Sequence, residues 1–223
     1  MLPKVKLLQK MVESGVIAVI RRMPADKIDQ IAKSLVEGGV TALEVTIDSP
    51  LAFEIIHRLS KRFENHAVVG AGTVIDCESA YMAIHNGADF VFCPSLHEGV
   101  IRTTLRYGKV VVPGVMTPTE MITAVEWGAD LVKVFPAGGL GVKYIKDIKA
   151  PFSHIPIIPT GGVNLENVDS FIEAGVAAVG IGGKLIDSQA VKDSNFDKIT
   201  KTAIQFVNAV QAARLRIWHD CNL

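Results

Sequence analysis

Lys133 and Glu44 each interrupt an apolar run rich in β-branched residues, "LVKVFP" (131 to 136) and "ALEVTID" (42 to 48). Such runs are typical of buried strands, where an unpartnered charge is costly. Desolvation lowers the pKa of an amine from about 10.4 to roughly 7 to 8, which makes it a competent nucleophile toward a ketone. A carboxylate beside it can carry the protons of that addition. The two residues therefore indicate Schiff-base chemistry, with a salt-bridged interior lysine and a purely structural carboxylate as the alternatives.

The strand period supports a shared site. Successive strand residues point to opposite faces, so Glu44, Thr46 and Asp48 lie on one face and the apolar residues between them on the other. Lys133 lies between two valines and follows the same alternation. We expect both charged residues to point into one cavity.

Two glycine-rich stretches, "PTGGVN" (159 to 164) and "GIGGK" (180 to 184), are typical of loops that bind anions through backbone N–H groups. We expect Asn164 to cap the helix that follows the first stretch, and "TPTE" (117 to 120) to begin another helix. The predicted phosphate contacts are Gly161, Gly162, Gly182, Gly183 and Lys184.

The elements that must position these residues recur along the chain. Eight short β-branched runs occur at 15 to 21, 42 to 48, 67 to 73, 90 to 95, 110 to 115, 131 to 136, 156 to 162 and 177 to 183. Helical periodicity separates them, and a glycine marks several helix-to-strand junctions. This pattern predicts an α/β fold, a closed eight-stranded parallel β/α (TIM) barrel. An open doubly wound sheet is the alternative, but no G-x-G-x-x-G turn follows the first run.

Nothing in the sequence divides the chain. We therefore expect one domain over residues 1–223, with strands over 15–183 and a C-terminal helix over about 196–215.

Composition restricts the partners. Lys plus Arg and Asp plus Glu both number 23, so net charge gives no footprint for nucleic acid. No apolar run reaches the roughly 20 residues that span a membrane, and "MLPKVKLLQK" lacks the features of a secretory signal. Cys77, Cys93 and Cys221 are odd in number and lack metal-site spacing, which fits a reducing compartment. We expect a cytoplasmic protein with a small-molecule partner and Cys93 in its core.

No metal or other cofactor is expected, because the six histidines show no ligand spacing. Two alternatives to Schiff-base catalysis stay open. One is a metal-dependent enzyme with Glu44 and Asp48 as ligands, and the other is a sugar-phosphate-binding barrel that has lost catalysis.

Five motifs carry a family resemblance: "LEVT", "VGAGTV", "VPGVMTPTE", "KVFPA" and "PTGGV", in this order. Over about residues 10 to 213 the chain resembles the 2-keto-3-deoxy-6-phosphogluconate / 4-hydroxy-2-oxoglutarate aldolase family. The resemblance implies a class I aldolase of the barrel fold, a homotrimer, that cleaves a 2-keto-3-deoxy acid to pyruvate and an aldehyde. The galactonate-derived phosphate is an alternative substrate.

The resemblance also implies roles for single residues. Lys133 would form the Schiff base and Glu44 would act as the acid/base. The implied substrate-binding residues are Thr73, Pro94, Phe135 and Thr160. Some family members carry an arginine, which binds the substrate carboxylate, where this chain has Asp48; we hypothesise that Arg21 replaces it. Lys184 stands where the family prefers serine, so phosphate recognition can depend on charge here.

Overall fold

A computed structural model of the chain describes residues 2–220. Its strands are β1 (Val16–Ile20), β2 (Ala42–Thr46), β3 (Val68–Gly72), β4 (Phe90–Phe92), β5 (Val110–Val112), β6 (Gly114–Val115), β7 (Val132–Val134), β8 (Ile157–Pro159) and β9 (Val179–Ile181). Its helices are α1 (Pro3–Glu13), α2 (Ile28–Glu37), α3 (Ala52–Phe63), α4 (Cys77–His85), α5 (Glu98–Arg106), α6 (Pro118–Glu126), α7 (Ala137–Lys149), α8 (Val168–Glu173), α9 (Ser188–Lys192) and α10 (Phe196–Asp220). Strand and helix alternate as predicted.

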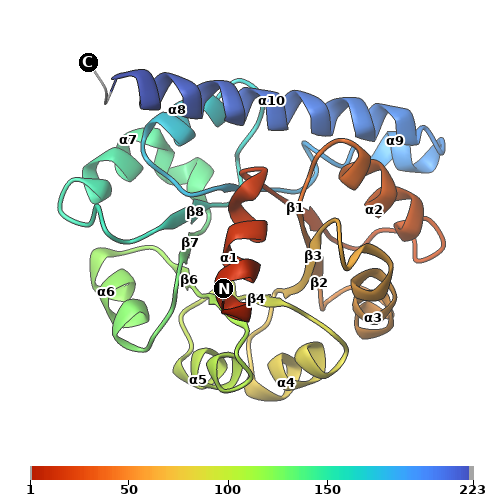
Figure 1. Cartoon of the computed structure of the whole chain (residues 1–223), viewed down its shortest axis with the longest axis horizontal. Coiled ribbons are helices and arrows are strands. Elements are labelled where there is room, and N and C mark those ends of the chain that lie inside the picture. The colour runs from red at the N-terminus through yellow and green to blue at the C-terminus, as the bar shows by residue number, and fades with distance from the viewer. Residues whose placement is uncertain (1, 221–223) are drawn as a thin grey trace.

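All pairings within the sheets are parallel, which confirms the α/β class. They form a six-stranded sheet, in the order β5-β4-β3-β2-β1-β9, and a three-stranded sheet, β6-β7-β8. The sheets curl inside a ring of helices (Figure 1). An isolated parallel bridge joins Thr160, after β8, to Gly180 in β9.

The prediction of one closed ladder of eight strands is not matched by these pairings. The run 110 to 115 forms two strands instead of one, because Pro113 between them has no N–H to donate to a neighbour. The carbonyl of Pro113 still accepts a hydrogen bond from the backbone of Lys133, at 2.8 Å. The chain therefore passes from one sheet to the other at Pro113.

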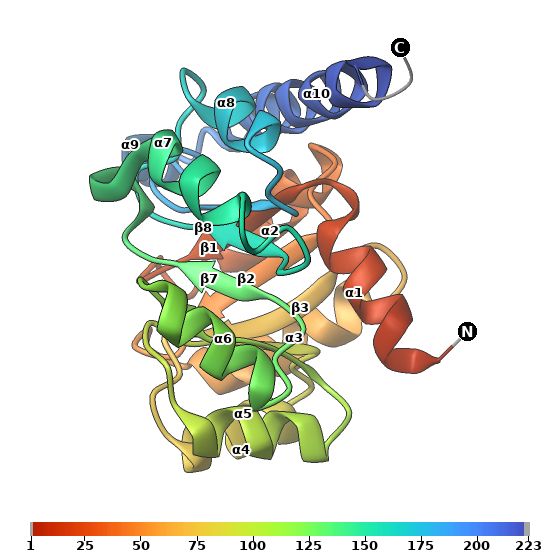
Figure 2. The same cartoon turned by 90° about the vertical axis from the view of Figure 1, so that its left-hand side faces the viewer.

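The two faces of the curled sheet carry different side chains. Leu43 and Val45 of β2 pack in the main apolar core with residues of the surrounding helices. Ala42 of β2 instead packs with Phe90 and Phe92 in a separate inner cluster, which the apolar side chains of α1 also contact. In Figure 1, α1 lies in the middle of the ring of helices, and Figure 2 shows it beside the sheets. The alternation predicted for the run 42 to 48 is confirmed for Ala42, Leu43 and Val45, whereas Ile47 and Asp48 follow the strand in a turn.

Helix α10 crosses the outside of α2 and α8 and continues five residues beyond the predicted end at 215 (Figure 1). Its Arg214 side chain donates to the carbonyl oxygens of Val12 and Glu13, both at 2.9 Å, and to that of Ala177 at 2.8 Å. A single guanidinium therefore joins α10 to the end of α1 and to the segment before β9.

The two predicted helix starts differ in outcome. "TPTE" forms a capping box, in which Thr117 and Glu120 satisfy each other's backbone N–H groups at the start of α6. The prediction for Asn164 is wrong, because α8 begins at Val168 with Asn167 as its N-cap. The side chain of Asn164 accepts from the N–H of Glu166 at 2.8 Å, which stabilises a turn before the helix.

Within residues 2–220, no helix combines the length and apolar character that crossing a membrane requires.

Candidate functional site

The centre of the site is Lys133 on β7, with Glu44 on β2. Both residues are buried: Lys133 is 6% exposed and Glu44 is 0% exposed. The Nζ atom of Lys133 lies 5.0 Å from the centroid of the Phe135 ring and 5.7 Å from that of Phe92. Neither carboxylate oxygen of Glu44 has a hydrogen-bond partner among the described residues, so Lys133 is not salt-bridged to it. Lys133 and Glu44 therefore do not form an interior ion pair.

Burial sets the protonation of Glu44. It raises the pKa of the Glu44 carboxyl above the ordinary value for glutamate, and the positive charges of Lys133 and Arg21 only partly oppose this effect. A carboxyl group with a raised pKa keeps its proton to a higher pH than an ordinary glutamate does, which suits an acid/base. The charges of Lys133 and Arg21 therefore both influence the protonation of the Glu44 carboxyl.

The thiol of Cys93, directly after β4, is influenced by the charges of Lys133 and Glu44. Burial raises the pKa of its thiol to about 12, with Lys133 lowering it and Glu44 raising it further. A thiol with this pKa stays protonated at neutral pH and is a poor nucleophile. The prediction that Cys93 is a small core residue is confirmed, since its exposed fraction is 0%.

An open cleft of about 480 Å³ lies at the carboxyl ends of β8, β9 and β1. This volume is within the range of roughly 300 to 1,000 Å³ that is usual for small-molecule sites. Seven of the residues predicted for substrate or phosphate line it: Arg21, Thr160, Gly161, Gly162, Gly182, Gly183 and Lys184. The two glycine-rich stretches, although separated in the sequence, therefore line a single cleft.

Phe135 and Thr160 connect the cleft to the buried centre. A Cβ atom placed on Gly161 would lie 3.4 Å from the Phe135 ring, so the ring packs against the cleft loop. The Thr160 hydroxyl is buried and has no partner among the described residues. It lies so close to Gly180 that a side chain there would overlap it. Thr160 therefore presents an unsatisfied hydroxyl where the cleft lining begins.

Arg21 is held by Asp48. Its Nε and Nη2 atoms donate to Oδ2 of Asp48 at 3.3 and 3.1 Å, and Arg22 Nε lies 3.0 Å from the same oxygen. Burial opposes ionisation of Asp48, but hydrogen bonds from Thr46 and Arg21 and the charges of both arginines together lower the pKa of Asp48 below its ordinary value. Asp48 is therefore an anion held between two cations.

The remaining predicted residues lie at the ends of other strands. Thr73 follows β3 and Pro94 follows β4, and both are half-buried. Thr73 has a φ of +62°, a left-handed conformation that is uncommon outside glycine and costs free energy. Neither residue is among those that line the cleft.

Sequence reasoning did not single out Phe92 and Arg22. The alternation of "FVFCPS" could have placed Phe92 on the inner face, since Phe90 and Phe92 are two residues apart. No sequence signal points to Arg22, which depends on the φ of +49° that turns its side chain toward Asp48.

Among the side chains that the structure describes, no group of three or more His, Cys, Asp or Glu could hold a metal ion.

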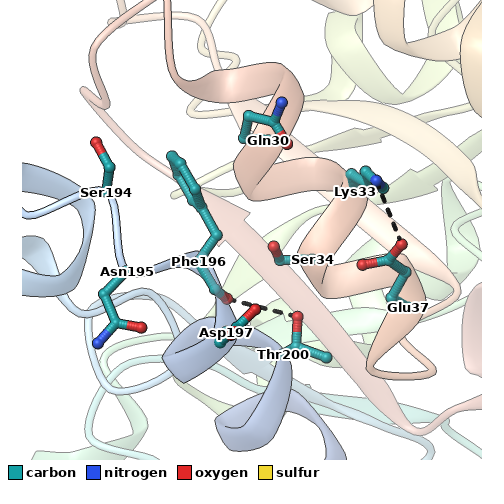
Figure 3. Close-up of a pocket in the computed structure, with 9 residues that line it drawn as sticks. All are labelled: Gln30, Lys33, Ser34, Glu37, Ser194, Asn195, Phe196, Asp197 and Thr200. Carbon is teal, nitrogen blue, oxygen red and sulfur yellow. Dashed lines mark hydrogen bonds and ion pairs between the residues drawn. The ribbon is translucent and has the colours of Figure 1, made fainter.

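A second hollow, of about 320 Å³, lies outside the ring of helices, between α2 and the start of α10 (Figure 3). Its polar groups pair locally: Lys33 with Glu37 at 3.6 Å, and the Thr200 hydroxyl with the carbonyl of Phe196 at 3.5 Å. It shares no lining residue with the cleft at the strand ends.

Known proteins resemble the chain over nearly its whole length. A model of the family described as "Aldolase: KDPG and KHG aldolase" matches residues 7–202. The 2-dehydro-3-deoxy-6-phosphogalactonate aldolase of Escherichia coli K12 is 33% identical over 196 residues, which cover 85% of this chain and 96% of that protein. The KHG/KDPG aldolase of the same strain is 34% identical over 187 residues, 83% of this chain and 85% of that protein.

A solved structure agrees with these relatives. KDPG aldolase from Legionella pneumophila, with pyruvate captured as a covalent carbinolamine intermediate, is 28% identical and superposes with a TM-score of 0.82. The match covers 88% of this chain and 96% of that one. The chain therefore belongs to the KDPG and KHG aldolase family, and it is a carbon–carbon lyase.

Proposed function

We propose that this class I aldolase uses Lys133 as its Schiff-base nucleophile. The observation that carries the proposal is the environment of the amine, which is 6% exposed, lies between the Phe92 and Phe135 rings, and has no salt bridge to the nearby Glu44. An amine that no carboxylate holds is available to attack a carbonyl carbon.

The reaction begins with covalent binding of the substrate. The Lys133 amine adds to the keto carbon of a 2-keto-3-deoxy acid to give a carbinolamine, and loss of water gives an iminium ion. A base takes the proton of the C4 hydroxyl, the C3–C4 bond breaks, and its electron pair flows into the iminium to form an enamine. The aldehyde leaves. The enamine is protonated at C3, and water releases pyruvate and restores the amine.

Glu44 is the proposed acid/base of these steps. Its raised pKa suits it to give a proton to the carbinolamine hydroxyl and to accept the C4 hydroxyl proton. Replacement of Glu44 by Gln keeps the shape but not the proton, and should lower kcat by about 10²- to 10⁴-fold.

Substrate contacts are proposed from the same layer of strand ends. Thr73, Pro94, Phe135 and Thr160 would contact the pyruvyl half, and Arg21 would bind its carboxylate. The cleft would also take a phosphate through Gly161, Gly162, Gly182, Gly183 and Lys184. The backbone is open at Gly182 and Gly183, and the Lys184 cation fits an anion.

The proposed substrate is 2-keto-3-deoxy-6-phosphogluconate, cleaved to pyruvate and glyceraldehyde 3-phosphate, or 4-hydroxy-2-oxoglutarate, cleaved to pyruvate and glyoxylate. The galactonate-derived phosphate is the alternative, because one of the relatives carries that name. The exposed Lys184 in the cleft favours a phosphorylated substrate. Values of kcat/KM for the three compounds would decide, and equal values for all three would contradict this preference.

The test of the mechanism is borohydride reduction in the presence of pyruvate, followed by intact-mass measurement. We expect the wild type to gain one reduced pyruvyl group and Lys133→Met to gain none. Lys109→Met is the matched control, because Lys109 also lies beside the sheet but pairs with Asp89 at 2.9 Å. No mass gain in the wild type would refute the proposal, and ligand binding without an adduct would favour a barrel that has lost catalysis.

A chelator distinguishes the lysine mechanism from a metal-dependent aldolase. Activity that survives exhaustive chelation supports the lysine mechanism, whereas activity that is lost and then restored by a divalent metal would favour Glu44 and Asp48 as ligands.

We further propose that the two sheets close into one eight-stranded barrel in which residues 110 to 115 act as a single strand. The Thr160–Gly180 bridge and the hydrogen bond from the Ala177 N–H to the Ile157 carbonyl, at 2.9 Å, support the closure between β8 and β9. Slow hydrogen exchange at Ala177, comparable to that of β2 amides, is expected. Fast exchange there would indicate an open edge.

A cytoplasmic homotrimer is the proposed state in the cell. Exposed apolar side chains on and beside α4 and α5 (Ile75, Tyr81, Met82 and Tyr107) offer a surface for self-association. Cys77 and Cys93 are free thiols, as a reducing compartment requires. Cys221 lies outside the described residues. Light scattering should give three times the mass of the chain, and cell fractionation would test the compartment.

A further inference from the structure

We propose that Asp48 is a positioning residue that fixes the guanidinium of Arg21 for the substrate carboxylate. The inference rests on the proposed aldolase function and extends it to a residue that touches no substrate. Arg21 donates to Asp48 through Nε and Nη2, so one edge of the guanidinium is occupied and the Nη1 group lies outside this pair. The free edge of a planar guanidinium suits a carboxylate ligand.

Arg21 reaches both parts of the site. It lines the cleft together with Thr160 and the glycine loops. Its positive charge also lowers the pKa of the buried Glu44, so the guanidinium acts on the catalytic carboxyl as well as on the cleft. An anion bound to Arg21 would therefore lie in the cleft.

The anchor itself is built into two strand ends. The side chain of Ser49 accepts a hydrogen bond from the backbone N–H of Arg22 at 2.8 Å, and its hydroxyl lies 3.1 Å from that of Thr46. These contacts join the segment after β1 to the turn after β2. Asp48 is thus held next to both arginines by backbone as well as by charge.

Without this anchor Arg21 would be mobile. Its side chain is 53% exposed, and a free arginine loses substantial rotamer entropy when it binds a ligand. The pair contributes little to folding, because ion pairs at this exposure are weak. Its effect is therefore expected on ligand binding rather than on stability.

The direction of the change in substrate affinity on removal of Asp48 distinguishes a positioning role from a purely electrostatic one. Asp48 is an anion close to the bound carboxylate, so removing its charge alone would strengthen the attraction of two arginines for an anionic substrate. Removing an anchor does the opposite and weakens binding. A weaker affinity after loss of Asp48 therefore identifies the positioning role.

The experiment measures the pyruvate concentration that gives half-maximal borohydride trapping, together with KM and kcat for cleavage. We expect Asp48→Ala to raise the half-saturating concentration and KM by about tenfold, since a hydrogen bond to a charged group is of the order that one decade in affinity requires. Asp48→Asn, which keeps an acceptor oxygen, should give a smaller rise. The value of kcat should stay within about twofold, because Lys133 and Glu44 are intact.

Arg21→Ala and the double variant Asp48→Ala/Arg21→Ala complete a cycle. If Asp48 acts through Arg21, the double variant binds pyruvate no worse than Arg21→Ala alone. Asp29→Ala is the matched control: Asp29 on α2 pairs with Arg58 at 3.0 Å and lies 3.8 Å from Arg62, at a comparable exposure, but is not among the residues that line the cleft. It should leave the half-saturating concentration unchanged.

Three results would overturn the inference: an unchanged half-saturating concentration in Asp48→Ala, a lower one, or additive effects in the cycle. Failure of the wild type to be trapped at all is a different outcome, because it refutes the lysine mechanism on which the inference rests.

Discussion

The carboxyl group of Glu44 occupies the space that a side chain on Gly72 would need. A Cβ atom on Gly72 would lie 2.6 Å from Cδ of Glu44, closer than real Cβ contacts come. The two residues are on neighbouring strands, where Thr46 pairs with Gly72. A buried carboxyl group therefore fits inside the curled sheet only because the facing position on β3 is glycine.

Gly72→Ala should push Glu44 out of place. We expect a loss of about 1 to 3 kcal/mol in the free energy of unfolding, as for other overpacked cores, and a fall in kcat because the acid/base is displaced. Urea unfolding and steady-state kinetics would measure the two effects. Gly139→Ala is the control, since a Cβ atom there meets nothing within 4 Å. Wild-type kcat in Gly72→Ala would show that the contact does not position Glu44.

A second prediction concerns the pH dependence of stability. The folded protein raises the pKa of Glu44, so it favours the protonated carboxyl more than the unfolded chain does. This contribution to stability is complete below the unfolded-state pKa of about 4.3 and is lost as pH rises through the folded-state pKa. Glu44→Gln lacks it, so the wild type should lose stability relative to this variant as pH rises.

Urea unfolding at a series of pH values would test this. The exposed Glu64 provides the control, and Glu64→Gln should follow the wild type at every pH. Parallel curves for the wild type and Glu44→Gln would mean that burial does not shift the proton of Glu44.

Much of the site followed from strand alternation. The strand period of two predicted that Leu43 and Val45 belong to the outer core, which the packing clusters confirm. The same clusters place Ala42, which has the same parity as Glu44, on the inner face. The same reasoning placed Lys133 between Val132 and Val134, which both belong to the outer core. Alternation was sufficient to predict these faces because successive side chains of a strand point to opposite sides of the sheet.

Other features depend on geometry that no short pattern contains. The contact between Arg21 and Asp48 joins residues 27 positions apart, and Arg22, which pairs with the same carboxylate, has a left-handed backbone conformation. The sequence shows the proline at position 113. It does not show that the strands on either side of Pro113 belong to different sheets, because that depends on the order of the strands. Asn164 had the right chemistry for a cap, yet three residues of turn separate it from the first turn of α8.

Thr160→Val should separate folding from function. The buried hydroxyl has no partner among the described residues, so an apolar side chain of the same shape should keep or raise stability. If the hydroxyl binds substrate, KM rises at the same time. Thr104→Val shows the reverse pattern, because the Thr104 hydroxyl donates to the Val100 carbonyl at 2.8 Å within α5. It should lose about 1 kcal/mol and keep normal KM. Unfolding and kinetics on both variants are decisive, and a destabilised Thr160→Val with normal KM would contradict the prediction.

Arg214→Met should destabilise the fold without touching the chemistry. The guanidinium of Arg214 satisfies the carbonyls of Val12 and Glu13 at the end of α1 and that of Ala177 before β9, so its loss leaves three acceptors without this donor. A cation also interacts favourably with the negative end of a helix. We expect a loss of about 2 to 3 kcal/mol in the free energy of unfolding, with kcat unchanged.

The neighbouring Arg216→Met separates this bridging role from the general loss of a positive charge on α10. Arg216 pairs with Glu173 at 2.8 Å and lies 3.6 Å from Asp169, and half of its side chain is exposed. An ion pair of this kind contributes about 0 to 1 kcal/mol. Equal losses in the two variants, measured by urea unfolding, would mean that the carbonyl contacts of Arg214 do not join α10 to the rest of the fold. A much larger loss in Arg214→Met would instead identify it as the residue through which the C-terminal helix stabilises the amino ends of the strands, on the side opposite the cleft.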